Sequence, residues 1–440
     1  MRDLLLLGIL VSALPFAVMY TWVGVLLWNW ISLMNPHKLA FGFAFDAPFA
    51  AAAAGATLLS LFIGRDKLRM PTDPPVIALF LFVVWMCITT ALAIDPAGSV
   101  DQLSKVLKIQ LMTGVAFAAI QSRKHIELFI WVAVMSIGFY GTKGGVFTLL
   151  SGGSQRVWGP PGTFIEDNNE LAVALVMTIP LIYYLRQVSS RAVVRHALLA
   201  MMLLCSISAL GSQSRGALLA MSAMAAVLWL RTRRKLLAGI TIAVLAASMV
   251  AFMPESWHER MSTIQTYEAD SSASERLEAW KMAFNLANDR PIGGGFNIYT
   301  PQNYAKYNPN SRLPQAAHSI YFSVLGEHGW VGLFLYLLLG VLSWRVASRI
   351  RRETIGLAQA AWAHHLAGMC QVALIGFAVG GAFLSLAYFD FTYNLIVILV
   401  ATRCWVGERS WEKEPRGVFG SGEPISSEAL VASREKRAAA

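Results

Sequence analysis

The sequence predicts an all-α polytopic membrane protein with about twelve transmembrane helices and one long structured periplasmic loop between the ninth and the tenth. The composition is the first observation: of the 440 residues, 56% are hydrophobic and 14% are charged, and the mean hydropathy is +0.53. A soluble domain carries about 25% charged residues, so most of this chain is expected to lie in a bilayer. The other two observations are the recurrence of long apolar runs and the basic loops that follow every second run.

The apolar runs divide the chain into four parts. Residues 1–253 hold the first nine runs, a polar domain at 254–318 follows, and residues 319–405 hold the last three. Residues 406–440 are rich in Gly, Ser and charged side chains, which predicts a disordered cytoplasmic tail. Pro15 in the first run favours a kinked or tilted helix, and we read its start as an uncleaved helix rather than a signal peptide. The runs, roughly 20 residues each, lie at 4–33, 40–63, 75–94, 105–120, 126–149, 170–185, 196–211, 216–230, 236–253, 319–343, 362–385 and 387–405.

Charge in the loops predicts the orientation. Lys and Arg are concentrated after the even-numbered runs, which places those loops and both termini in the cytoplasm. The loop at 254–318 is then external, as are the short loops after the odd-numbered runs. Because the positive-inside rule selects against cations in external loops, each cation found there needs a local reason, and anion binding is the natural one. These cations are Lys38, Lys143, Arg156 and Arg215.

The long loop should be structured. Ser272-x-x-Glu275 resembles a capping box, and Leu277, Trp280, Phe284 and Ala287 follow at helical spacing on one face. This helix should end near Arg290-Pro291 and the three glycines after it. Residues 297–316 are expected to be loop, and their tyrosines (Tyr299, Tyr304 and Tyr307) suit an interfacial lid over the membrane.

His318 lies where this loop meets the next apolar run. It either caps the start of the tenth helix or acts as a general base, because a neutral imidazole can accept a proton from a hydroxyl near pH 7. Tyr321, three residues later, would share a helix face with it.

Two arginines are candidates for binding an anion. Arg290 either complements the end of a helix dipole or, with the glycine-rich turn after it, binds a phosphate. Arg215 lies in a short polar break between two apolar runs. Because an arginine exposed to lipid costs several kcal/mol, Arg215 should face the protein interior or an anion.

Three further residues lie near the predicted outer face. Arg156 lies in a glycine- and proline-rich external segment and can bind an anion. Asn169 belongs to an Asp-Asn-Asn sequence that is either a helix cap or a polar group pointing into the bundle. Asp390, near the outer end of the last run, is either functional or paired with one of the arginines.

Other classes of site are not supported by the sequence. No metal-ligand spacing, P-loop or Asp-x-Asp motif is present, so no cofactor and no nucleotide-driven reaction is expected. The four cysteines lie in apolar runs without metal or disulfide spacing. The net charge of +10 reports membrane topology first and does not indicate nucleic acid.

Two motifs at the ends of the polar segment, in a polytopic chain with a late external loop, resemble the O-antigen ligase/polymerase superfamily. They are Arg290-Pro-x-Gly-Gly-Gly-Phe and His318-Ser-x-Tyr…Gly326-Glu-x-Gly329. Shorter sequences resemble the branch of O-glycosylation ligases found in exosortase-containing bacteria: Trp28-x-Trp30-x-Ser-x-Met-Asn-Pro36-His and Thr163-Phe-Ile-x-Asp167-Asn-Asn.

The resemblance implies a GT-C-like glycosyltransferase of the bacterial inner membrane with a periplasmic active site. Such enzymes transfer a glycan from undecaprenyl pyrophosphate to a hydroxyl of the lipid A-core oligosaccharide, without metal or ATP and with inversion. The family's essential histidine matches His318, and its arginines match Arg215 and Arg290. Arg156, Asn169, Tyr321 and Asp390 match by position more than by motif. Membrane lipids are the other expected partners, and a monomer is expected.

Two alternatives stay open on the sequence. The acceptor can instead be another lipid-linked glycan, as in an O-antigen or exopolysaccharide polymerase, or a protein, as in an O-oligosaccharyltransferase. A membrane transporter is the alternative from a different class. A transporter predicts ionisable residues near the middle of the membrane and internal repeats, whereas here the internal charges cluster toward the external face.

Overall fold

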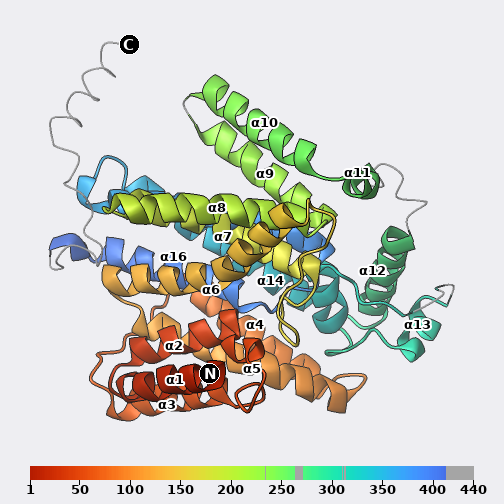
Figure 1. Ribbon diagram of the computed structural model, residues 1–440. Helices are drawn as coiled ribbons and strands as arrows, with labels where there is room; N and C mark the ends of the chain where they lie inside the picture. Colours follow the sequence, from red (N-terminus) through yellow and green to blue (C-terminus); the bar gives the residue numbers. More distant parts are fainter. Residues whose placement is uncertain (233, 263–270, 310, 312–313, 413–440) are drawn as a thin grey trace.

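The computed structural model describes residues 1–232, 234–262, 271–309, 311 and 314–412. The described residues are largely helical and contain no β-strand, which confirms the all-α prediction. The helices are α1 (Arg2–Met19), α2 (Thr21–Met34), α3 (Phe49–Ile63), α4 (Pro74–Ala91), α5 (Pro96–Ala119), α6 (Arg123–Leu150), α7 (Asn168–Val188), α8 (Ala192–Gly211), α9 (Arg215–Arg231), α10 (Lys235–Phe252), α11 (Glu255–Ser262), α12 (Ser271–Asp289), α13 (Pro301–Tyr307), α14 (Ile320–Glu353), α15 (Ala361–Gly380) and α16 (Asp390–Gly407), with short 3-10 turns that include η1 (Pro36–Leu39) and η4 (Gly381–Phe383). The long helices run side by side, and α11, α12 and α13 lie together at one end of the bundle (Figure 1).

The core lies around α7 and α16. Most residues of these two helices are buried, whereas α10 buries none. After its first residue, Lys235, α10 carries no charged residue, and such an apolar helix must be covered either by protein or by lipid. In Figure 1, α9 and α10 form a pair at the edge of the bundle, so lipid is the expected cover of α10.

Eight helices of the described residues are long and apolar enough to cross a membrane, judged by length and composition. This number supports a polytopic membrane protein but does not confirm the predicted twelve spans. Two further helices, α2 and α3, are apolar but shorter than a usual span. The predicted run at 105–120 lies within the longer α5, whose first half carries charged residues.

The first predicted span, 4–33, is not one helix. Pro15 lies inside α1, and the chain breaks at Tyr20, whose backbone is extended (φ −133°, ψ 111°). The chain then reverses, since the Asp3 carboxylate accepts hydrogen bonds from the backbone N–H groups of Gly42 and Ala44, both at 3.1 Å. α1 and α2 therefore form an antiparallel hairpin, and the prediction of a single kinked span was wrong.

This reversal places the start of α1 far from the end of α16. Ser32, near the end of α2, donates a hydrogen bond to Asp390 at the start of α16. The first residues of α1 therefore lie near the start of α16, at the end of the bundle that carries α12. Glu408, just after α16, pairs with Arg69 at the opposite end. The start of α1 and the end of α16 therefore lie at opposite ends of the bundle. The predicted side of the C-terminus stays a prediction, because residues 413–440 lie outside the described residues.

The polar segment between α10 and α14 contains α11, α12 and α13. The predicted helix after the capping-box sequence is present as α12, although the Ser272 side chain lies outside the described residues. Its buried face was predicted only in part. Ala287 is buried as expected and Trp280 is half-buried, but Leu277 and Phe284 are exposed, and Ala279, Met282 and Leu286 are buried instead.

The expected loop at 297–316 contains the helix α13. Tyr304 and Tyr307 pack in a small core with the buried face of α12 instead of forming a lid over the membrane. The last part of the predicted tail, 413–440, lies outside the described residues.

Candidate functional site

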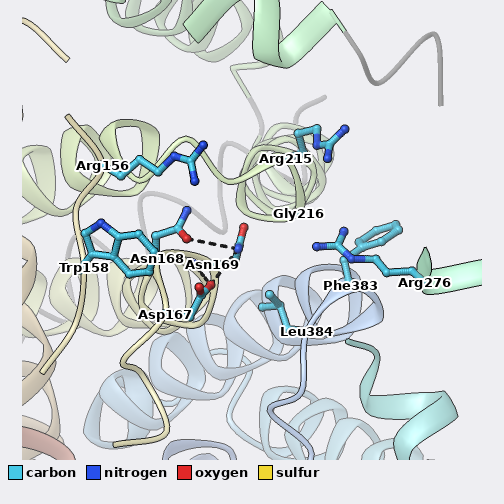
Figure 2. Close-up of a pocket in the computed structure, with 10 residues that line it drawn as sticks. All are labelled: Arg156, Trp158, Asp167, Asn168, Asn169, Arg215, Gly216, Arg276, Phe383 and Leu384. Atoms are coloured by element: carbon cyan, nitrogen blue, oxygen red, sulfur yellow. Dashed lines mark hydrogen bonds between the residues drawn. The ribbon is translucent and has the colours of Figure 1, made fainter. Parts of the chain in front are cut away.

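A polar cavity lies between the ends of several helices, on the side of the bundle that carries α12. Its volume is about 160 Å³. Three arginines reach it from three separate segments, and an acidic and amide-rich helix start lies opposite them (Figure 2). The lining residues are Arg156, Trp158, Asp167, Asn168, Asn169, Arg215, Gly216, Arg276, Phe383 and Leu384.

Arg156 comes from the segment between α6 and α7. Its Nε donates a hydrogen bond to the side-chain oxygen of Gln213 at 3.4 Å, and the Gln213 amide donates to the Gly153 carbonyl at 3.3 Å. Asn168 donates to the Ser212 carbonyl at 2.6 Å. The segment is thus fastened to the turn between α8 and α9, and this turn brings Arg156 and Arg215 to the same cavity.

Arg215 is the first residue of α9, and Ser214 caps that helix by accepting a hydrogen bond from Ala217 N–H at 3.3 Å. The N-terminus of a helix carries a partial positive charge and unpaired N–H groups, so it favours an anion. A cation at this position is unfavourable unless an anion is close. The position of Arg215 therefore adds to the anion preference of the cavity.

Arg276 extends into the cavity from α12, and sequence reasoning missed it. Trp280, one turn later on the same helix, stacks on Phe322 with ring centroids 4.8 Å apart and an interplanar angle of 7°. Its indole N–H also donates to the Ala317 carbonyl at 2.8 Å. These contacts dock α12 against the start of α14 and set the place of Arg276. The only available signal was its position directly after the capping-box sequence.

Asp167 and Asn169 belong to the start of α7. Asp167 is the N-cap, and its carboxylate accepts hydrogen bonds from the Asn169 backbone N–H and side-chain amide, both at 2.8 Å. Burial alone would raise the pKa of Asp167, but hydrogen bonds from Glu170 and Asn169 and the nearby His318 outweigh it and lower the pKa. Asp167 thus stays ionised at neutral pH. The predicted cap is present, and both residues also line the cavity.

His318 is not among the residues that line the cavity. It lies between Ala317 and α14 and interacts electrostatically with two residues that do, Arg276 and Asp167. Its backbone is in the left-handed region (φ +42°), and Ser319 takes the N-cap position of α14, so the capping interpretation of His318 does not hold. Burial lowers the pKa of its imidazole, Arg276 lowers it further, and Asp167 opposes them. The charges of two cavity residues therefore act on His318. Its imidazole is neutral at pH 7, as a general base must be.

Arg290 does not line the cavity. Its guanidinium donates a hydrogen bond to the Leu92 carbonyl at the end of α4, at 2.7 Å. The role of Arg290 in a site with His318 stays a prediction, and the third arginine of this cavity is Arg276. The sequence favoured Arg290 as a phosphate-binding residue because a glycine-rich turn follows it. In the structure this turn contacts α14.

The glycine-rich turn pairs with the second motif instead of forming a free phosphate cradle. The N–H groups of Gly294 and Gly295 donate to the carbonyls of Gly326 and Glu327 at 2.9 and 2.8 Å, and Trp330 N–H donates to the Pro291 carbonyl at 3.1 Å. Helix α14 is broken at Gly329 (φ +66°, ψ −167°) to admit the turn. The two motifs therefore hold the start of α14, and with it His318, against the segment after α12.

Tyr321 and Asp390 lie outside the cavity lining. The Tyr321 hydroxyl donates to the Ala378 carbonyl of α15 at 2.8 Å. Asp390 is buried and accepts the hydrogen bond from Ser32 described above, so within the described residues its partner is a hydroxyl rather than an arginine. The structure gives both residues contacts that join helices. Among the described residues, no group of three or more potential metal ligands is found.

Fold and cavity together define a polytopic helical membrane protein with an arginine-lined polar cavity at one end of its bundle. Residues 172–337 match the family described as O-antigen ligase. This part of the chain therefore carries an O-antigen ligase domain, which confirms the resemblance to the O-antigen ligase/polymerase superfamily; the exosortase-associated branch is not confirmed. Residues 1–190 match a family of unknown function. No curated protein sequence matches the chain.

Proposed function

We propose that this protein transfers a glycan from undecaprenyl pyrophosphate to an acceptor hydroxyl at the cavity, on the periplasmic face of the inner membrane. The observation that carries the proposal is the convergence of Arg156, Arg215 and Arg276 from three segments on one cavity, two of whose lining residues act electrostatically on His318. Three of these four residues lie within the O-antigen ligase match. The acceptor we favour is the lipid A-core oligosaccharide.

The arginines suit a pyrophosphate because it carries several negative oxygens that need charged hydrogen-bond donors. Hydrogen bonds between guanidinium and phosphate are charge-assisted and often bidentate. The start of α9 adds N–H groups aimed at the same anion. As the glycan leaves, negative charge grows on the pyrophosphate, and donors fixed in advance stabilise that charge most in the transition state. This supplies the activation without metal or nucleotide.

His318 is assigned as the general base. The acceptor oxygen attacks the anomeric carbon, the bond from that carbon to the pyrophosphate oxygen breaks, and the acceptor proton passes to the imidazole. A single displacement of this kind inverts the anomeric carbon. Undecaprenyl pyrophosphate is the leaving group. Asp167 stabilises the imidazolium that forms, because it is the acidic group that acts electrostatically on His318.

Trp158 is assigned to the glycan. It lines the cavity beside the arginines, and 57% of its surface is exposed. An exposed indole offers a flat apolar face on which a sugar ring can pack, together with an N–H donor. Trp158 therefore extends the site from the pyrophosphate toward the sugars.

The test is a transfer assay with purified protein, lipid-linked glycan and acceptor, in EDTA and without ATP. We expect the wild type to form product and His318→Ala to form none while retaining its fold. Separate reactions with lipopolysaccharide core, with a second lipid-linked glycan and with a Ser- or Thr-containing peptide identify the acceptor. Full activity of His318→Ala would exclude the general-base role, and wild-type transfer to none of the acceptors would exclude the proposed reaction.

A further inference from the structure

Two arginines share one neutral acceptor at the end of the bundle opposite the cavity. Arg231, the last residue of α9, donates from Nη2 to the side-chain oxygen of Gln371 in α15 at 3.0 Å. Arg351, near the end of α14, donates from Nη1 to the same oxygen at 3.2 Å. The Gln371 amide nitrogen donates to the Ser348 hydroxyl at 2.8 Å, which fixes its oxygen toward the arginines. Gln371 is 1% exposed, so both guanidinium groups contact a buried residue.

This pair differs from two other arginines at this end of the bundle. Arg349 and Arg403 each pair with Glu353, at 2.8 and 2.9 Å. Within the described parts of the chain, no carboxylate is found at ion-pair distance from Arg231 or Arg351. Two like charges on one neutral oxygen repel each other, and at the edge of a bilayer water screens them poorly. The arrangement therefore calls for an anion.

Gly368 leaves room beside the two arginines for at least one further heavy atom. A Cβ atom built on Gly368 would meet only the Nε of Arg351, at 3.8 Å. That Nε is buried and has no hydrogen-bond partner among the described residues. Arg231 borders the same glycine, since its Nη1 donates to the Gly368 carbonyl at 3.2 Å, and its guanidinium lies over the Trp344 ring at 5.7 Å. An oxyanion over Gly368 would face donors from both arginines.

The surroundings indicate a lipid as the source of this oxyanion. The site lies at the ends of α9 and α14, where the helices turn from apolar runs to basic loops. Trp229 and Trp344 lie close by in the sequence, and tryptophan is enriched at the level of lipid headgroups. Leu228 and Leu230, beside Arg231, are 37% and 61% exposed and offer an apolar surface for acyl chains.

We propose that Arg231 and Arg351 bind the phosphate group of an anionic phospholipid over Gly368, on the side of the membrane opposite the cavity. The lipid phosphate supplies the negative charge that the two arginines lack. It also ties α9 to α14 and α15. Because α9 begins at Arg215, the bound lipid fixes the helix that carries a cavity arginine.

The test measures lipid binding and thermal stability of the full-length protein in detergent freed of lipid. Phosphatidylglycerol, phosphatidylcholine and inorganic phosphate are added separately, and retained lipid is counted by native mass spectrometry. Phosphatidylglycerol should bind and raise the unfolding temperature, and phosphatidylcholine should bind more weakly because its choline cation opposes the arginines. Equal stabilisation by inorganic phosphate alone would overturn the assignment to a lipid.

Three variants locate the site. Arg231→Gln and Arg351→Gln should each weaken phosphatidylglycerol binding about tenfold, as expected for loss of a charged hydrogen bond. Arg349→Gln is the matched control on the same helix, because Arg349 is exposed and paired with Glu353, and its lipid binding should equal that of the wild type. Loss of binding in Arg349→Gln equal to that in Arg351→Gln would show a diffuse charge effect and overturn the site.

Gln371→Glu gives a test that does not depend on removing an arginine. The new carboxylate would pair with both guanidinium groups and replace the lipid phosphate. This variant should be more heat-stable than the wild type without lipid, and phosphatidylglycerol should no longer raise its unfolding temperature. An undiminished response to phosphatidylglycerol in Gln371→Glu would contradict the proposal.

Discussion

Replacing Gly329 by alanine should destabilise the protein strongly, because the glycine-rich turn after α12 packs against the break in α14 at this residue. The residue has φ +66° and ψ −167°, a conformation that costs an L-residue about 1–3 kcal/mol. A Cβ at this position would lie 1.9 Å from the Pro291 carbonyl oxygen, so the glycine-rich turn must move away from α14. Overpacking of this kind costs about 1–3 kcal/mol more. The expected loss in the free energy of unfolding is therefore about 2–6 kcal/mol.

Gly340→Ala is the matched control. Gly340 lies in the same helix, and a Cβ there would have nothing within 4 Å. Alanine favours a helix over glycine by about 1 kcal/mol, so this variant should be as stable as the wild type or slightly more stable. Denaturant and thermal unfolding of the purified variants measure the difference. Equal stability of Gly329→Ala and Gly340→Ala would refute the pairing of the turn with the break in α14.

Three further predictions concern the site and the topology. Arg276→Gln should raise the KM for the lipid-linked donor by tenfold or more, because a charged hydrogen bond contributes about 1.5–3 kcal/mol. Arg290→Gln should lower thermal stability and leave that KM unchanged. A raised KM in Arg290→Gln with an unchanged KM in Arg276→Gln would place Arg290 in the donor site. Because burial lowers the pKa of His318, transfer should persist below the usual histidine value of 6.5 and fall only at lower pH, where the imidazole gains a proton. Arg276→Gln should shift this acid limb to higher pH and Asp167→Asn to lower pH, and pH–rate profiles that do not move would exclude the coupling. Single cysteines at Arg2→Cys and Arg409→Cys should react with an impermeant maleimide from opposite sides of the membrane; labelling of both from one side would contradict the hairpin of α1 and α2.

Cavity residues could be predicted from the sequence where a residue type occurs in a position that a general rule disfavours. Arg156 and Arg215 are cations in loops from which the positive-inside rule removes them, so each one indicated a ligand. The structure brings both to one cavity. The helix at 271–289 was also predictable, because its polar start and its glycine-rich end follow ordinary capping chemistry.

The remaining parts carried no such signal. Arg276 lies in a polar segment where an arginine carries no desolvation cost, so its presence there gave no signal. Its place in the cavity depends on the packing of Trp280 on Phe322, which the sequence does not reveal. The glycine-rich turn looked like a phosphate cradle because its partner, the break at Gly329, is far away in the sequence. The break at Tyr20 has neither glycine nor proline, while the visible signal, Pro15, lies inside a continuous helix.

The pyrophosphate site is best tested by the binding of undecaprenyl pyrophosphate, measured separately from transfer. The wild type and His318→Ala should bind it equally, because His318 acts on the acceptor. A variant with both Arg215→Gln and Arg276→Gln should bind at least a hundredfold more weakly, if each lost hydrogen bond costs about 1.5–3 kcal/mol. The double variant Arg345→Gln and Arg349→Gln, with the same loss of charge at the opposite end, should bind like the wild type. Equal binding by both double variants would contradict the account, because the cavity would then not be the pyrophosphate site.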